Sequence, residues 1–278
     1  MNDKILKIIF IILFELLTLN SATAKTISTA SLDSNTMKKI ERWVEKGTTV
    51  FIELDDTVMI PESKMFSFIA NPNRQFIDNI VIASRKMPAY KQAAAAWYGQ
   101  RRVKLVDDKW IDFIGRLKAK GAIIYGICKM PLRLTNIEEK RYQEVKQLGI
   151  NFLSTVNNQE SLVIAKKNDW FSAFHKGIIF IGPYSQAQAL LDFIRVTNHI
   201  PPKMLVIGSS ESAIKKIDQA LKIFNMYYYS VYYTGARTAL AKPDSAVVKL
   251  QQRELIQNNR WLEDDAAAAL LTQNNDKK

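Results

Sequence analysis

The segment that decides the fold is Thr49-Val50-Phe51-Ile52-Glu53-Leu54-Asp55-Asp56-Thr57. Its apolar first part predicts a short buried strand. The strand runs directly into two carboxylates that are two residues apart, Glu53 and Asp55. Open α/β sheets bind their ligands outside the carboxyl ends of the strands, so these side chains are candidate site residues. The alternative is that the acidic cluster only caps the turn after the strand.

Strands and helices alternate along the chain from residue 48 onward. Further short apolar runs predict buried strands at residues 122–127, 177–181, 203–207 and 226–233. Amphipathic segments predict helices at residues 34–46, 107–121, 135–149, 185–196 and 211–224, and in the last forty residues. Residues 61–106 show no clean strand and predict mostly helix, and residues 151–170 predict an irregular flap or hairpin. Buried strands that alternate with helices predict a three-layer α/β sandwich with a parallel central sheet.

Composition excludes a disordered chain and points to anionic partners. The 278 residues are 47% hydrophobic and 24% charged, which is enough to bury a core. The formal net charge of +12 favours an anionic ligand or surface, such as acidic lipid, lipopolysaccharide or a phosphorylated molecule. The basic clusters are short and are not interleaved with aromatic residues, so there is no specific nucleic-acid signature. A solvated basic surface is the simpler interpretation, and the partner stays unknown.

The first 24 residues match a secretory signal peptide. Basic residues lie within Met1 to Lys7, an apolar run follows from Ile8 to Leu19, and Ala22-Thr23-Ala24 supplies small residues at the cleavage spacing. An uncleaved membrane anchor is the alternative, but the run is short for about 30 Å of hydrocarbon and contains Glu15. We therefore predict an exported protein that is periplasmic, outer-membrane-associated or secreted, without a transmembrane span after cleavage.

Glu53, Asp55 and Thr57 resemble the first motif of haloacid-dehalogenase-like (HAD-like) phosphotransfer domains, Asp-x-Asp-x-Thr. In that motif the first aspartate attacks phosphorus and the second serves as general acid and base. The resemblance places Glu53 at the nucleophile position and Asp55 at the acid/base position. Glutamate is one methylene longer than aspartate, and in-line attack needs aligned atoms about 3–3.5 Å apart. The replacement therefore argues against ordinary aspartyl-phosphate chemistry.

Three other strand ends fall at the remaining motif positions, and each departs from the pattern. Cys128, the only cysteine, replaces a hydroxyl that donates to the phosphoryl group, and Gln186 replaces a lysine. Gly208 and Ser209 replace the carboxylates that hold Mg²⁺. We expect Glu53, Cys128, Gln186 and Ser209 to converge in one crevice as a degenerate phosphate site without a metal. A catalytic thiol is an alternative for Cys128, although a small buried apolar side chain is the simpler interpretation.

The whole pattern resembles the domain-of-unknown-function 2608 family, signal-bearing bacterial members of the HAD-like superfamily. The resemblance covers roughly residues 35–270 and is strongest at Tyr232-Tyr233-Thr234-Gly235-Ala236 and Asn258-Asn259-Arg260-Trp261-Leu262-Glu263-Asp264-Asp265-Ala266. It implies a HAD-like, Rossmann-like core of residues 25–60 and 107–278. It also implies a small, mostly helical cap inserted at residues 61–106.

Two functions from different classes follow from these motifs. The first is an exported HAD-like protein that has lost phosphatase activity and binds an unidentified ligand or partner, without a cofactor. The alternative is a divergent Mg²⁺-dependent phosphohydrolase that uses Glu53 and Asp55. The residues at all four motif positions differ from the HAD-like pattern. Phosphoryl transfer depends on positioning and charge, which the residues of that pattern supply. The sequence therefore favours the first function.

Overall fold

The structure is a computed structural model that describes residues 24–66, 71–84, 86–130, 134, 136–167, 170–223, 226–237 and 242–275. Within these residues, eight strands form one sheet in the order β1-β10-β9-β2-β5-β8-β7-β6. They are β1 (Ala24–Thr29), β2 (Thr49–Glu53), β5 (Ile123–Cys128), β6 (Ser161–Lys167), β7 (Trp170–His175), β8 (Ile178–Phe180), β9 (Met204–Gly208) and β10 (Tyr228–Tyr233). The strands from β1 to β8 in that order are parallel, and β7 and β6 add an antiparallel hairpin at one edge. The prediction of a mostly parallel α/β sheet is confirmed.

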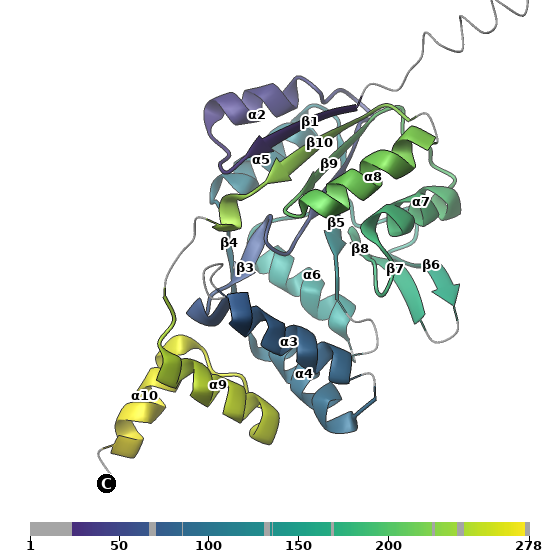
Figure 1. Cartoon of the computed structure of the whole chain (residues 1–278). Helices are drawn as coiled ribbons and strands as arrows, with labels where there is room; N and C mark the ends of the chain where they lie inside the picture. Colours follow the sequence, from purple (N-terminus) through teal and green to yellow (C-terminus); the bar gives the residue numbers. More distant parts are fainter. Residues whose placement is uncertain are drawn as a thin grey trace, which may run out of the picture.

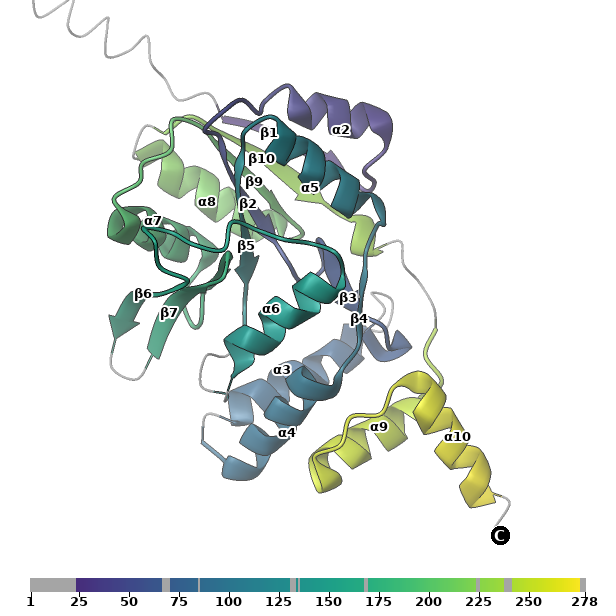
Figure 2. The same cartoon turned by 180° about the vertical axis from the view of Figure 1, so that it is seen from behind.

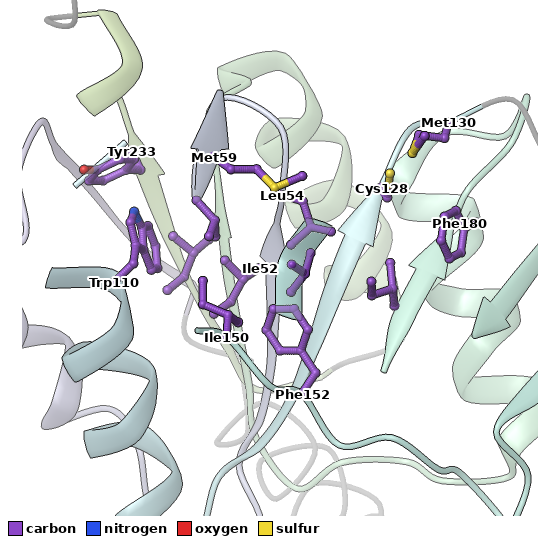
Figure 3. Packing of buried hydrophobic residues seen from close by; sticks show 14 of the residues in the cluster. Ile52, Leu54, Met59, Trp110, Cys128, Met130, Ile150, Phe152, Phe180 and Tyr233 are labelled. Atoms are coloured by element: carbon purple, nitrogen blue, oxygen red, sulfur yellow. The ribbon is translucent and has the colours of Figure 1, made fainter. Parts of the chain in front are cut away.

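Helices cover both faces of this sheet, which makes three layers (Figures 1 and 2). One face carries α2 (Ser34–Glu41), α5 (Lys109–Ala119) and α6 (Ile137–Gln147), and the other carries α7 (Gln186–Thr197) and α8 (Glu211–Ile223). Successive side chains of a strand point to opposite faces. Val50 and Ile52 of β2 accordingly join the cluster with α2 and α5, whereas Phe51 joins the cluster with α7 and α8. Figure 3 shows part of the first cluster, with Ile52, Leu54 and Cys128 near the strand ends.

A smaller unit lies beyond the carboxyl ends of the parallel strands. It contains β3 (Met59–Pro61), the short 3₁₀ helix η1 (Lys64–Phe66), α3 (Asn71–Ala83), α4 (Pro88–Gln100) and β4 (Val103–Leu105). The two strands pair antiparallel and close the base of the unit. The prediction that residues 61–106 are mostly helical agrees with α3 and α4, whereas the short strand β4 at residues 103–105 was not predicted. A strand of only three residues is too short to show an apolar alternation in the sequence.

The C-terminal helices join this smaller unit. α9 (Ser245–Asn258) packs against α4, and α10 (Asp264–Asn275) packs against α9, away from the sheet in both views (Figures 1 and 2). The joint is aromatic: the ring of Trp97 lies 4.4 Å from that of Phe66 and 4.5 Å from that of Trp261, centroid to centroid. The boundaries of a core at 25–60 and 107–278 and a cap at 61–106 stay a prediction. In space, α9 and α10 lie with the predicted cap.

The first helix is shorter than predicted. It was expected to span residues 34–46, but it ends at Glu41. The amides of Trp43 and Val44 donate to the carbonyl oxygens of Ile40 and Glu41, at 2.9 and 3.2 Å. Each of these bonds joins an amide to the carbonyl three residues earlier, as in a 3₁₀ turn. The α-helix, whose bonds span four residues, therefore ends at Glu41.

The edge strand β1 follows directly after the predicted signal peptide. It pairs with β10 along its whole length, from Ala24 opposite Tyr228 to Thr29 opposite Tyr233, and was not predicted. The predicted signal peptide, residues 1–24, lies outside the described residues except for Ala24. In the described part of the chain, no helix combines the length and apolar character needed to cross a membrane.

Candidate functional site

The predicted site residues come from four neighbouring segments at the carboxyl edge of the sheet. Glu53 ends β2 and Cys128 ends β5, while Gln186 begins α7 and Ser209 directly follows β9. Parallel strands bring these ends together because all of them finish at the same edge. The structure places Glu53, Gln186 and Ser209 in direct contact, and Cys128 next to Asp55.

The carboxylate of Glu53 is fixed by neutral hydrogen-bond donors. Its Oε1 accepts from Nε2 of Gln186 at 2.7 Å, and its Oε2 accepts from the backbone N and the Oγ of Ser209 at 2.8 and 3.0 Å. A Cβ atom at Gly208 would lie 3.0 Å from Oε2, so the glycine leaves room for this arrangement. Burial raises the pKa of Glu53, and the bonds from Ser209 and Gln186 offset only part of that rise.

Asp55 is held by buried arginine. Nη2 of Arg141, whose side chain is fully buried, donates to both carboxylate oxygens of Asp55 at 3.0 and 3.3 Å. Nη2 of Arg101 lies 4.0 Å from the same carboxylate. Burial works to raise the pKa of Asp55, but the charges of Arg141, Arg101 and Arg74 outweigh it, and the pKa lies below its usual value. Asp55 is therefore a carboxylate that stays ionised and paired.

Glu144 completes a quartet of two buried arginines and two carboxylates, of which Glu144 is 11% and Asp55 36% exposed at the side chain. It accepts from Nε and Nη2 of Arg101 at 3.0 and 3.2 Å, and lies 3.1 Å from Nη1 of Arg141. Burial alone would lower the pKa of Arg141, but Asp55 and Glu144 among others hold it above its usual value. The guanidinium of Arg101 also lies over the rings of Trp97 and Tyr98, at 5.3 and 5.0 Å from their centroids.

Cys128 is a buried thiol. Its residue is 1% exposed, and its Sγ lies 3.8 Å from Oδ2 of Asp55. Burial raises the pKa of the thiol far above its usual value, so the reactive thiolate is disfavoured. Figure 3 places it at the tip of β5, in the same apolar cluster as Leu54, Met130 and Phe180. These surroundings favour the small buried apolar side chain over the catalytic thiol.

Asp56 links the loop after β2 to the helices beyond it. Its backbone has a φ of 62°, in the left-handed region that most side chains avoid. This turn presents the carboxylate to Nη2 of Arg74 on α3, at 2.5 and 2.6 Å from its two oxygens. Burial raises the pKa of Asp56, and Arg74 opposes that rise. The ion pair fastens α3 over the strand ends.

Three hollows share Glu53. The largest, about 460 Å³, is lined by hydroxyl-bearing residues that include Ser209, Ser210 and Thr234. A second, about 280 Å³, lies between Asp55 and the α3–α4 unit, and a third, about 270 Å³, is bounded by Gln186. Lys129 lines the second and third hollows, and within the described part of the chain it has no hydrogen-bond or ion-pair partner. The residues that line the crevice are mostly polar.

The donor atoms of this crevice do not fit Mg²⁺. That ion takes oxygen ligands in near-octahedral geometry, usually with one or two carboxylates. Here both oxygens of Glu53 already accept hydrogen bonds, and Asp55 is paired with Arg141. Over the described ranges, no three His, Cys, Asp or Glu side chains are grouped so that they would hold a metal ion.

The arginines of the site were missed by the sequence interpretation. Arg101 follows the helix α4, and Arg141 lies on α6. A signal was present for Arg141. It lies four residues after Ile137 and four before Val145, so it falls on the same buried stripe of the helix.

The fold and the crevice define an α/β protein with a polar site at the carboxyl edge of a mostly parallel sheet. The chain belongs to the family described as "Protein of unknown function (DUF2608)", whose family model matches residues 31–268. It is also similar to an uncharacterized protein of Rickettsia prowazekii (strain Madrid E), with 29% identity over 251 residues, which cover 89% of this chain and 92% of the relative. No solved structure matches the chain.

Proposed function

We propose that this chain is a HAD-like protein that has lost phosphoryl transfer and uses the crevice around Glu53 to bind a small polar ligand. The observation that carries the proposal is the pairing of Glu53 with Gln186 and Ser209. These residues fall at the nucleophile, lysine and metal-acid positions of the HAD motifs. In place of a lysine and a metal ion, the carboxylate of Glu53 meets only uncharged hydrogen-bond donors.

This cluster opposes the first step of phosphoryl transfer. A nucleophilic carboxylate needs a lone pair aimed at phosphorus, whereas Oε2 of Glu53 accepts two hydrogen bonds from Ser209 and Oε1 is held by Gln186, which leaves one lone pair on Oε1. Gln186 brings no positive charge to balance a phosphoryl group. Catalysis of this reaction is almost entirely positioning and electrostatic stabilisation. The cluster therefore lacks both the positioned nucleophile and the positive charge that phosphoryl transfer requires.

Asp55 is equally unsuited to the second role. A general acid has to carry a proton near the working pH. The pKa of Asp55 lies below its usual value because Arg141 and Arg101 stabilise the carboxylate. Asp55 then acts as a fixed partner of the buried arginines, which position α4 and α6 over the strand ends.

The same surroundings suit reversible binding. Hydroxyl-bearing residues line the largest hollow, and Lys129 lines two hollows beside Glu53. Ligand pockets commonly combine a few polar groups that fix orientation with a concave wall. We further propose, from the signal-like first 24 residues, that binding takes place outside the cytoplasm.

A phosphatase assay tests the loss of catalysis. Wild-type protein with Mg²⁺ and p-nitrophenyl phosphate is compared with Asp55→Asn, and Mg²⁺ is titrated into the protein by calorimetry. We expect no turnover above the buffer rate and no heat of Mg²⁺ binding. Metal-dependent turnover that Asp55→Asn abolishes would overturn the proposal and establish the divergent phosphohydrolase instead.

A thermal-shift screen tests the binding role. A ligand that binds the folded state raises Tm by mass action. We expect at least one member of a panel of sugar phosphates and nucleotides to raise Tm, and Lys129→Ala to reduce that shift. Lys64→Ala, a change of an exposed lysine away from the three hollows, is the matched control. An equal shift in Lys129→Ala and wild type would contradict binding in this crevice.

A further inference from the structure

A serine, a histidine and a glutamate form a hydrogen-bonded line on the β6–β7 hairpin, outside the crevice around Glu53. Oγ of Ser161 lies 2.7 Å from Nδ1 of His175, and Nε2 of the same ring lies 3.0 Å from Oε2 of Glu139. Ser161 begins β6, His175 ends β7, and Glu139 lies on α6. Nucleophile, base and orienting acid in this order are the parts of a serine acyl-transfer site.

The carboxylate sets which ring nitrogen carries the proton. Glu139 also accepts from Nζ of Lys176 at 3.1 Å and from Nε2 of Gln143 at 2.7 Å. Those bonds, with the bond from His175, lower the pKa of Glu139 to about 2, so it remains an acceptor. His175 then donates from Nε2–H, and its Nδ1 keeps a lone pair that accepts the Ser161 hydroxyl proton. Ser161 is thereby bonded to a base in the required tautomer.

The fold holds these groups in place. Ser161 and His175 are directly opposite each other in the antiparallel register of β6 and β7. The edge of the His175 ring meets Tyr142 of α6, with centroids 6.4 Å apart and planes at 85°. Ser161 is exposed, whereas the side chain of His175 is only 18% exposed. The nucleophile faces solvent while its base is shielded.

An apolar hollow lies beside this line. Its volume is about 370 Å³, and Ser161, His175 and Glu139 line it together with Leu162, Val163 and Phe171. Ala173 and Phe174 add to the apolar part of its lining, and Asn136 and Glu138 to the polar part. The apolar part suits the acyl chain of an ester better than a charged group.

We propose that Ser161, His175 and Glu139 form a second reactive site, in which Ser161 accepts acyl groups from short-chain esters. Oγ of Ser161 bonds to the ester carbonyl carbon as its proton passes to Nδ1 of His175. The ester C–O bond breaks, and the alcohol leaves with that proton. Water then attacks the acyl group, His175 takes a proton from the water, and the acid leaves as the proton returns to Oγ. The net reaction is ester plus water to acid plus alcohol.

The alternative is a structural role, in which the three side chains only fasten the hairpin to α6. Reactivity separates the two roles, because a fastening bond does not activate a hydroxyl. A fluorophosphonate probe is incubated with the full chain, and the modified peptide is located by mass spectrometry. p-Nitrophenyl butyrate hydrolysis is measured in parallel. Ser34→Ala, which removes another exposed serine, is the matched control.

We expect the probe to modify the peptide that contains Ser161, and Ser161→Ala to remove both the label and ester hydrolysis. His175→Gln and Glu139→Gln should slow labelling, by about 10²-fold or more for the base. Circular dichroism establishes that each variant is folded, and Ser34→Ala should match wild type. An unlabelled Ser161, under conditions that label trypsin, overturns the proposal. Ester hydrolysis that persists in folded Ser161→Ala overturns it as well.

Discussion

At the scale of single residues, Glu53 is a partly buried carboxylate whose hydrogen-bond donors are all uncharged. Hydrogen bonds from Gln186 and Ser209 stabilise the ionised form, yet burial still raises the pKa. A glutamine at this position would keep the bonds to Ser209 through its carbonyl oxygen. The side-chain amide of Gln186 would flip by 180°, so that its oxygen accepts from the amide nitrogen of the new glutamine.

Glu53→Gln is therefore expected to raise the free energy of unfolding at pH 7. The folded pKa of Glu53 lies above its unfolded value, so the ionised carboxylate destabilises the fold at any pH above the folded pKa. That penalty disappears as the pH falls through the folded pKa towards the unfolded value. Urea unfolding of both proteins between pH 4 and pH 7 measures the difference.

The stabilisation by Glu53→Gln should shrink steadily on acidification. Glu160→Gln, at an exposed glutamate, controls for the loss of one carboxylate. A glutamine variant that is less stable than wild type at pH 7, with a gap that narrows on acidification, would show that the charge of Glu53 stabilises the site.

Arg141 is the residue whose loss should cost the most stability within the site. Arg141→Met leaves the carboxylates of Asp55 and Glu144 with Arg101 as their remaining ion-pair partner. Removal of one partner from a buried ion pair typically costs about 3–5 kcal/mol. Denaturant unfolding at pH 7 measures this loss. Arg253→Met changes a side chain that is 55% exposed, so its free energy of unfolding should stay close to that of wild type. Equal losses of stability in both variants would show that the ion pairs of Arg141 do not stabilise the fold.

The sequence could predict some of these residues and not others. Glu53, Gln186 and Ser209 stand at strand or helix ends, and the parallel sheet brings such ends together wherever it forms. Arg101 and Arg74 reach the same place from the α3–α4 unit, whose position over the sheet no local pattern encodes. Arg141 falls on a buried helical stripe, but a charge there is normally taken as surface.

At the scale of elements, an aromatic joint and a polar joint are among the contacts that hold the C-terminal helices. Trp261, just before α10, meets the rings of Trp97 and Phe66. Close by, Oδ1 of Asp264 accepts from Oγ of Ser63 at 2.6 Å and from Nε2 of Gln251 at 2.9 Å. Both joints connect segments that are far apart in the sequence.

Trp261→Ala should therefore destabilise the fold by about 3–5 kcal/mol, the usual cost when a large aromatic side chain is removed from a packed site. Trp261 is only 5% exposed, so the change leaves a cavity against Trp97. Chemical denaturation followed by tryptophan fluorescence measures the change. Ile223 is 79% exposed, so Ile223→Ala should differ little from wild type in stability. A Trp261→Ala protein as stable as that control would mean that α9 and α10 dock through other contacts.

Some strands can be predicted from the sequence pattern and others cannot. β2, β5 and β9 are buried on both faces, so each is a continuous apolar run and was predicted. β4 has three residues, and the edge strand β1 carries polar residues and follows the predicted signal peptide. Their pairing with distant segments forms them, and a local pattern does not record such pairing.

At the scale of the whole molecule, the predicted cleavage point coincides with the first strand that the structure describes. β1 begins at Ala24, and the pairs from Lys25 opposite Tyr229 to Thr29 opposite Tyr233 all lie after that residue. Cleavage after Ala24 would thus remove a single residue from the edge strand. The mature chain would keep nearly the entire β1–β10 pairing, and a cut further downstream would shorten it.

We expect the protein recovered from a bacterial host that secretes it to begin at Lys25. Signal peptidases require small residues before the cleavage point, which Ala22 and Ala24 supply. Intact-mass spectrometry of the periplasmic fraction measures the new terminus. Ala22→Arg should block cleavage and leave the full-length chain with the membrane fraction, while Ala30→Arg, beyond β1, should leave cleavage unchanged. Wild-type protein that keeps residues 1–24, or that begins downstream of Lys25, would contradict the predicted signal peptide, since a terminus further into β1 removes several pairs that the folded sheet contains.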